Sequence, residues 1–225
     1  MAAELDHVFI CTTRGGGAEA ESLAALGVSE GSPNAHPGQG TACRRFFFRN
    51  AYLELLWVDK PDEAQSEPVR PLRLWERWVG RAEQACPFGF GFRPKANEAA
   101  SPPFAAWPYR PAYLPESQSI PVAANSGVVS EPMLFYMPFA QRPDCQPDPK
   151  RQQPLDHAAG LREISRVELV LPGGPRISGE LQELQKAGLL DITEGANYLL
   201  VLRFDGEMRG KHADLQPGLP LVLRW

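Results

Sequence analysis

Glu54 is the side chain whose surroundings most clearly demand a chemical partner. It stands between Leu53 and Leu55 in a segment whose apolar, β-prone residues predict a buried strand. An ionised carboxylate is expensive to bury alone, so we expect a cation or a hydrogen-bond donor to face it. Arg44 and Arg45, one strand away, would provide a structural ion pair, whereas a metal ion or a substrate would make Glu54 functional.

His7 and His36 are the next candidates, and each has two interpretations. His7 lies in the first apolar strand, where a hydrogen-bonded core histidine and a functional histidine both fit the sequence. His36 opens the loop at 36–41, which has the glycines but not the lysine of a phosphate-binding loop. We expect His36 to be a surface or capping residue, with binding at the rim of a pocket as the alternative. Cys11 and Cys43, within strands, are expected to be small core residues.

Aromatic residues could line a pocket around these groups. Small-molecule sites are mostly apolar with a few polar groups, although core packing explains each aromatic residue taken singly. The candidates are Trp57, Trp107, Tyr109, Tyr113 and Tyr136.

The composition limits the kind of partner. The chain of 225 residues has 23 basic and 27 acidic side chains, a net charge of −4, and no basic stripe of the kind that binds nucleic acid. No apolar run is long enough for a membrane span and no leader pattern opens the sequence, so we expect a cytoplasmic protein. The four cysteines are far apart and form no C-x-x-C pair, which favours reduced thiols over a disulfide framework.

The first 60 residues predict a strand–helix–strand–strand–strand unit that would position these groups. Its expected elements are a helix at 18–26 and strands at 5–12, 28–31, 41–49 and 52–58. Residues 161–225 repeat this order at nearly the same spacing, which indicates an internal duplication.

Between these two units the pattern changes. Residues 61–85 predict a connector helix with an aromatic stripe, and 86–140 a strand-rich unit without a helix, in which every second residue from 88 to 92 is phenylalanine. A proline-rich linker follows at 141–160. Of the 23 prolines, 14 lie within 87–154. The helix-less unit and its linker are therefore where the repeat departs from its pattern.

The motifs of the first unit point to a family. The chain opens with L-D-H-V-F-I at 5–10 and carries H-P-G-Q-G-T at 36–41 and Y-L-E-L at 52–55; H-A-A-G follows at 157–160. In these segments it resembles the glyoxalase-like domain branch of the vicinal oxygen chelate superfamily, which includes glyoxalase I, extradiol dioxygenases and bleomycin-resistance proteins. The last segment is similar to an H-P-N-G element of that branch in two of its four letters.

This resemblance implies an α+β fold in which repeated βαβββ units form a curled mixed-sheet cup. We expect the first two units to form the main cup, with the third packed beside it. The alternative pairs the first and third units, with the proline-rich middle lying over them. In metal-using members the first and fourth strands of each unit supply ligands to a divalent ion, which stabilises a substrate oxyanion or enediolate.

His7 and Glu54 match these first-strand and fourth-strand ligand positions, and Glu54 is also the expected catalytic residue. The matching positions of the second unit, Phe88 and roughly Leu134, offer no ligand, and three protein ligands are the usual minimum. The candidates for the third ligand are His36, Glu131 and His157. His157 is preferred because its surroundings resemble a family element, so the predicted metal ligands are His7, Glu54 and His157.

The function implied by the resemblance is the binding of a small molecule in the cup. A divalent ion (Zn, Ni, Mn or Fe) would make the protein an isomerase, lyase or dioxygenase acting on an oxygen-rich substrate. Without it, the protein would sequester a planar or aromatic molecule, as bleomycin-resistance proteins do; a structural module with a degenerate cup is the third alternative. A homodimer is a further expectation. The predicted substrate contacts are His36, Arg44, Arg45, Trp57, Trp107, Tyr109 and Tyr136.

Overall fold

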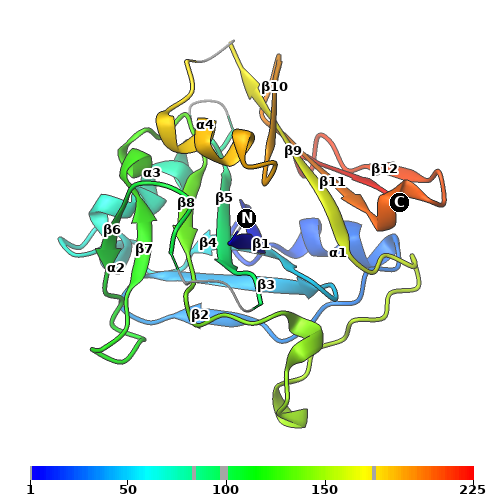
Figure 1. Ribbon diagram of the computed structural model, residues 1–225, viewed down its shortest axis with the longest axis horizontal. Helices are drawn as coiled ribbons and strands as arrows, with labels where there is room; N and C mark the ends of the chain where they lie inside the picture. The colour runs from blue at the N-terminus through cyan, green and yellow to red at the C-terminus, as the bar shows by residue number, and fades with distance from the viewer. Residues whose placement is uncertain (1, 83–84, 97–100, 174–175) are drawn as a thin grey trace.

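Four strands form the first half of a curled sheet, and a helix connects the first of them to the second (Figure 1). The computed structural model describes residues 2–82, 85–96, 101–173 and 176–225. The elements of this half are β1 (Ala3–Cys11), α1 (Gly17–Ala25), β2 (Asn34–His36), β3 (Thr41–Phe47) and β4 (Tyr52–Val58). They pair in the order β2-β3-β4-β1, with β1 parallel to β4. The element order is that of a βαβββ unit, although its second strand lies at 34–36 rather than 28–31.

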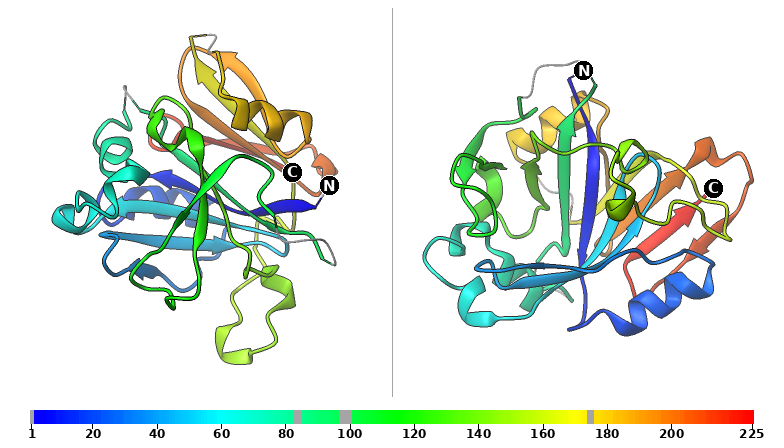
Figure 2. Two further views of the ribbon diagram at one scale, coloured as in Figure 1. Left: turned by 60° about the vertical axis from the view of Figure 1, so that its left-hand side comes forward. Right: turned by 90° about the horizontal axis from the view of Figure 1, so that it is seen from below.

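The second half repeats this arrangement without an α-helix among its described residues. Its elements are β5 (Phe88–Pro94), β6 (Ala106–Tyr109), β7 (Ile120–Ala123), η2 (Ala124–Gly127) and β8 (Met133–Tyr136). They pair in the order β5-β8-β7-β6, and antiparallel pairing of β1 with β5 joins the halves into one eight-stranded sheet. The sheet curls into a half-barrel (Figure 2), which confirms the predicted fold class. The first two units share this sheet, the preferred of the two pairings.

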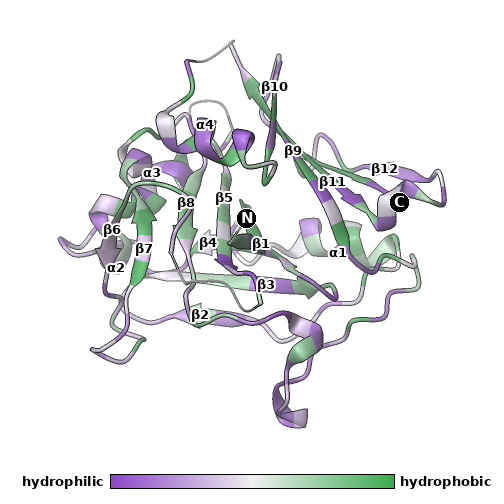
Figure 3. Ribbon diagram, viewed as in Figure 1, coloured by the Kyte–Doolittle hydropathy of each residue, from purple (hydrophilic) through white to green (hydrophobic). Residues whose placement is uncertain are grey.

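The alternation along β5 shows how the sequence assigns the two faces of this sheet. Successive side chains of a strand point to opposite faces. Phe88, Phe90 and Phe92 are buried in the larger apolar cluster, with residues of α1 and of the second sheet, and the apolar colour of β5 is visible in Figure 3. Gly89 lies on the other, concave face, where a Cβ atom would meet Cε1 of Phe9 at 2.1 Å. One face is thus packed while the other is hollowed.

Residues 164–224 form a separate five-stranded sheet. Its elements are β9 (Ile164–Pro172), α4 (Gly179–Lys186), β10 (Asp191–Gly195), β11 (Leu199–Phe204), η5 (Asp205–Glu207), β12 (His212–Asp214) and β13 (Leu221–Arg224). The strand order is β10-β9-β11-β13-β12, with β9 antiparallel to β11. This pairing differs from that of the first unit, so the similar element order of the two regions does not extend to topology.

The connectors consist of short helices. The 61–85 connector contains α2 (Pro61–Ala64), η1 (Arg70–Leu72) and α3 (Leu74–Val79) instead of one helix. The left-handed backbone of Arg73, with φ 56°, separates η1 from α3. The 141–160 linker contains η3 (Pro143–Cys145) and η4 (Pro149–Arg151).

Some predicted features lie outside the described residues. They are the end of the connector helix at 83–84, residues 97–100 of the second unit and the turn residues 174–175. Within the part of the chain that is described, no helix combines the length and the apolar character needed to span a bilayer.

Candidate functional site

A cavity opens on the concave face of the eight-stranded sheet, with an empty volume of about 460 Å³. Most of its wall is apolar, contributed by Phe9, Leu56, Leu74, Ile120, Val122, Met133 and Phe135. Its polar groups are His7, His36, Gln39, Glu54, Tyr109 and Tyr113. An apolar hollow with a few converging polar groups is the usual form of a small-molecule site.

Strand pairing explains why His7 and Glu54 line this cavity together. The adjacent, parallel strands β1 and β4 set His7 beside Tyr52 and Phe9 beside Glu54. Because alternate residues of a strand share a face, all four side chains project to the concave side. The structure thus brings two of the three predicted metal ligands to one cavity.

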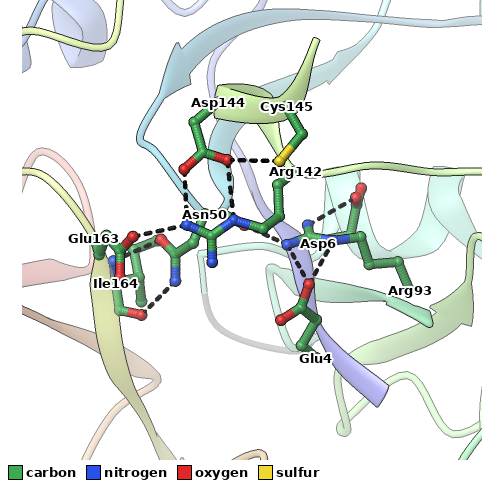
Figure 4. A network of polar contacts seen from close by, with 9 residues as sticks. All are labelled: Glu4, Asp6, Asn50, Arg93, Arg142, Asp144, Cys145, Glu163 and Ile164. Carbon is green, nitrogen blue, oxygen red and sulfur yellow. Dashed lines mark hydrogen bonds and ion pairs between the residues drawn. The ribbon is translucent and has the colours of Figure 1, made fainter. Parts of the chain in front are cut away.

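The imidazole of His7 is hydrogen-bonded to a buried ionic network. Its Nδ1–H donates to Oδ2 of Asp6 at 2.6 Å, because a carboxylate can only accept. The other oxygen of Asp6 accepts from Nη1 of Arg93 at 3.1 Å. Arg93, whose side chain is 1% exposed, also donates to Oε1 of Glu4 at 2.8 Å and to the backbone oxygen of Asn50 at 2.7 Å (Figure 4). Sequence reasoning missed Asp6 and Arg93.

The network and the packing together set the state of His7. Burial opposes its protonation, but the hydrogen bond to Asp6 and the charges of Glu54 and Asp6 outweigh that effect, so the pKa of His7 is raised above its ordinary value. Its ring stacks on Tyr52, with centroids 4.5 Å apart, and meets the edge of Phe135 at 5.0 Å. Asp6 and these two rings fix the orientation of the imidazole.

Glu54 is buried and lacks the arginine partner that its sequence context suggested. Only 5% of the residue is exposed. Its cross-strand neighbour Arg45 donates Nε–H to the backbone oxygen of Ser32 at 2.8 Å, and Arg44 is bound to Glu30. Among the described residues no cation pairs with the Glu54 carboxylate. The predicted structural ion pair is therefore wrong, and this carboxylate faces the cavity.

Two further side chains come close to Glu54. His36, Cys43 and Glu54 each offer one ligand atom, and these atoms lie within 4.8 Å of one another. The pairing of β2 with β3 positions His36 and Cys43. His36 lies opposite Thr41, and Cys43, two residues after Thr41, lies on the same face of β3 as Thr41. Imidazole, thiolate and carboxylate are all ligands of divalent transition ions. Cys43 is fully buried in the smaller apolar cluster, which confirms the prediction of a small core residue, and sequence reasoning did not foresee that it also lies beside Glu54.

Burial controls the protonation of His36 and Cys43. It lowers the pKa of His36. It raises the pKa of the Cys43 thiol, and the charge of Glu54 raises it further. Nε2 of His36 lies 3.1 Å from the amide nitrogen of Asn34, which can only donate, so Nδ1–H donates to Oγ1 of Thr41 at 2.9 Å. Glu54 thus has a neutral imidazole and a protonated thiol as neighbours.

Residues 5–104 match the family model described as a glyoxalase-like domain. The chain contains a glyoxalase-like domain. This match confirms, over residues 5–104, the resemblance based on the motifs of the first unit. No curated protein matches the chain.

Solved structures resemble the fold of this chain. One, a hypothetical protein from Staphylococcus aureus, has a TM-score of 0.55 at 12% identity, and the match covers 100% of this chain and 99% of that chain. The second sheet is therefore part of a recurring arrangement. Another, a xylose isomerase-like TIM barrel/4-hydroxyphenylpyruvate dioxygenase fusion protein, has a TM-score of 0.44 at 12% identity over 91% of this chain and 37% of that chain.

His157 is not part of the glyoxalase-like cup. Its Nδ1 accepts from the backbone N–H of Ser29 at 3.0 Å, and its Nε2–H donates to the backbone oxygen of Phe47 at 2.8 Å. Both ring nitrogens are thus bonded to backbone groups, which cannot swing away as a side chain can, and burial lowers the pKa of this histidine. The prediction of His157 as third metal ligand is wrong, because its two bonds tie the 141–160 linker to the first unit.

The predicted substrate contacts divide between the cup and other parts of the protein. His36 and Tyr109 line the cavity. Tyr136 is buried on the opposite face of the sheet, and Nε1 of Trp107 donates to Oγ of Ser126 at 3.3 Å. Leu56 lines the cavity, and because side chains alternate along a strand, the next residue, Trp57, points to the opposite face of the sheet. The predicted residues that do not line the cavity are Arg44, Arg45, Trp57, Trp107 and Tyr136.

Proposed function

We propose that the cup is the active site of a small-molecule enzyme with a divalent ion, an isomerase or lyase acting on an oxygen-rich substrate. The observation that supports this is the Glu54 carboxylate, which is buried, has no cation partner among the described residues and lies within 4.8 Å of ligand atoms of His36 and Cys43. Desolvation disfavours a carboxylate in such a hollow, and a bound cation would offset that penalty.

The donor set fits a divalent ion, and zinc best. Three protein ligands that include imidazole and thiolate leave a fourth position for water or substrate, as catalytic zinc sites do. Both ring nitrogens of His36 are hydrogen-bonded to side chains, Nε2 to Asn34 and Nδ1 to Thr41, so one of these bonds would give way to the ion while the other orients the ring. When bound, such an ion polarises a carbonyl group and stabilises the negative charge that develops on its oxygen.

Other side chains of the cup would handle the substrate itself. The Nδ1–H of His7 is committed to Asp6, so Nε2 is the atom that would give or take a substrate proton. Tyr109 stands in the second half of the cup, where burial raises its pKa to about 12, so its hydroxyl stays protonated and would donate to a substrate oxygen. The apolar walls would exclude water and accept a planar molecule.

Metal analysis by emission spectroscopy, on protein purified without an affinity tag, tests this proposal. We expect near-stoichiometric zinc or a related ion, and loss of most of it in Cys43→Ser and Glu54→Gln. Cys145→Ser is the matched control, because this thiol is exposed and lies in the linker. A protein that stays metal-free after incubation with Zn, Ni, Mn or Fe ions would sink the proposal.

A metal-free binding protein is the second candidate. It is favoured by the second half of the cup, which faces the cavity with apolar side chains such as Met133 and Phe135 and with no metal ligand among its lining residues. Titration of EDTA-treated protein with planar aromatic compounds, followed by calorimetry, tests it. We expect saturable binding that weakens in Phe135→Ala. Binding that is restored only by added metal would contradict this candidate.

A further inference from the structure

A second hollow lies at the far end of β3 and β4, with an empty volume of about 800 Å³. Strand residues form one side and the 141–153 segment of the linker the other. Hydrogen bonds tie this segment down: the backbone N–H of Ser32 donates to Oε1 of Gln153 at 2.9 Å, and that of Asp144 to the backbone oxygen of Arg49 at 3.1 Å. The side chains that matter here are Arg45, Phe47, Tyr52, Arg142, Lys150 and Arg151.

The charge in this hollow is one-sided. Four of its lining residues are cationic and none is acidic, in a chain whose net charge is −4. Arg142 is neutralised by Asp144 at 2.8 Å and by Glu163 at 2.7 Å (Figure 4). The other three cations of the hollow are Arg45, Lys150 and Arg151. None of them has a carboxylate partner among the described residues. Gathered like charges repel one another, and an anion between them would relieve that repulsion.

Arg45 is held in place without losing its charge. Its Nε–H and Nη2–H donate to the backbone oxygens of Ser32 at 2.8 Å and Pro33 at 3.4 Å, both neutral acceptors, and its guanidinium lies 5.1 Å from the ring centroid of Phe47. Phe47 in turn stacks on Tyr52 with centroids 4.9 Å apart. The remaining N–H groups of this guanidinium, on the side of Nη1, are held beside an aromatic ring and can donate to a carboxylate or a phosphate.

We propose that this hollow binds the anionic group of a small molecule, a phosphate or a carboxylate, through Arg45, Lys150 and Arg151. Phe47 and Tyr52 form the floor on which the bound molecule rests. The site borders the cup, because the opposite contact of Tyr52 is the ring of His7 at 4.5 Å. It uses none of the metal-ligand candidates, so it stands whether or not the cup binds an ion.

Calorimetric titration of the full chain with inorganic phosphate, and separately with malonate, tests this site. We expect saturable binding that weakens with added salt. Arg45→Gln and the double variant Lys150→Gln/Arg151→Gln should each weaken it by about tenfold, the loss of roughly one charge-assisted hydrogen bond. The matched control Lys211→Gln/Arg224→Gln removes two exposed cations from the second sheet and should bind like the wild type. The anion that binds more tightly identifies the ligand group.

Three results would overturn the proposal. They are the absence of saturable binding of either anion, equal binding by the wild type and both variants, and equal weakening in the control. The exposed positions of Lys150 and Arg151 keep the test independent of folding. A labelled single-stranded oligonucleotide that binds tightly and is lost in the same variants would assign the hollow to nucleic acid instead. The metal content of these variants should equal that of the wild type, so failure here is separable from failure of the metal proposal.

Discussion

The two halves of the cup have the same strand order but present different side chains to the cavity. The β1–β4 half presents two imidazoles, a thiol and a carboxylate to the concave face, whereas the β5–β8 half presents glycines, apolar side chains and two tyrosines. Where the strands of the halves meet, Gly91 lies opposite His7 and Gly89 opposite Phe9. A repeated architecture therefore fixes where side chains point, and the residue at each inward position decides whether a half supplies ligands or a wall.

The second half nevertheless contributes to the chemistry of the first. Arg93 of β5 reaches across to Asp6, which holds His7. Its neighbour Gly91 leaves room for the same histidine, because a Cβ there would lie 2.9 Å from Cε1 of the ring. The β5–β8 half thus helps to position His7, a reactive group that belongs to the β1–β4 half.

Removing Arg93 should have the largest effect. Arg93→Met would leave the buried Asp6 with His7 as its one remaining partner, and breaking a buried ion pair costs about 3–5 kcal/mol. Urea unfolding monitored by circular dichroism measures this loss. Arg166→Met is the control, because Arg166 and Asp191 form an exposed ion pair whose removal should cost less than about 1 kcal/mol. Equal losses in the two variants would mean that the network does not support the first half.

Filling the space left by the second half should have the next largest effect. In Gly89→Ala the new Cβ would meet the Phe9 ring at 2.1 Å. Overpacking of this kind costs about 1–3 kcal/mol, which the same unfolding experiment measures. Gly127→Ala is the control, since no atom lies within 4 Å of a Cβ at that position. A Gly89→Ala protein as stable as its control would show that the glycines of β5 are not needed for space.

The sequence predicted the first half better than anything else, because its signals are local. Runs of β-prone residues set β1, β3 and β4, and the motifs of the first unit select His7 and Glu54, which the pairing of β1 with β4 then places on one face. Each of these features depends on residues close together in the chain.

The features that escaped prediction depend on residues far apart in the chain. His157 meets Ser29 and Phe47, from which it is 128 and 110 positions away, so its role depends on the path of the linker. Arg93 and Asp6 are 87 positions apart. The pairing of the second sheet also differs from that of the first unit despite a similar order of elements. Sequence spacing alone cannot report such contacts.

His157, outside both halves of the sheet, gives a pH test that separates a structural histidine from a site histidine. Its pKa in the folded protein is lowered by burial, and Asp156 is the charge that acts against this. The unfolded chain therefore binds more protons near pH 6, and the stability owed to neutral His157 is present above its unfolded pKa of about 6.5 and is lost as pH falls from there through its lower folded pKa.

His157→Gln should accordingly be less stable than the wild type at pH 7.5, by about 1–2 kcal/mol for two disturbed hydrogen bonds. The gap between the two proteins should narrow toward pH 5, because only the wild type carries this proton-linked loss. Urea titrations at several pH values give the difference. Metal content should be the same in both proteins, and a fall in the variant would return His157 to the list of ligands.

The smallest expected change is a gain, and it bears directly on the first half of the cup. Glu54→Gln removes a buried charge that has no cation partner among the described residues, so the metal-free protein should become more stable by up to about 1 kcal/mol. Glu131→Gln is the control with the opposite sign. Glu131 accepts from Nδ2 of Asn125 at 2.8 Å and from the N–H of Ser178 at 2.7 Å, and an amide in its place would weaken both bonds.

Unfolding in EDTA and then in excess zinc measures this gain. Zinc should stabilise the wild type, since it would bind the folded state, and should leave Glu54→Gln almost unchanged. A Glu54→Gln protein that loses stability in EDTA as Glu131→Gln does would mean that Glu54 has a structural partner. The proposed metal site would then lose the observation that supports it, and neither half of the cup would supply metal ligands.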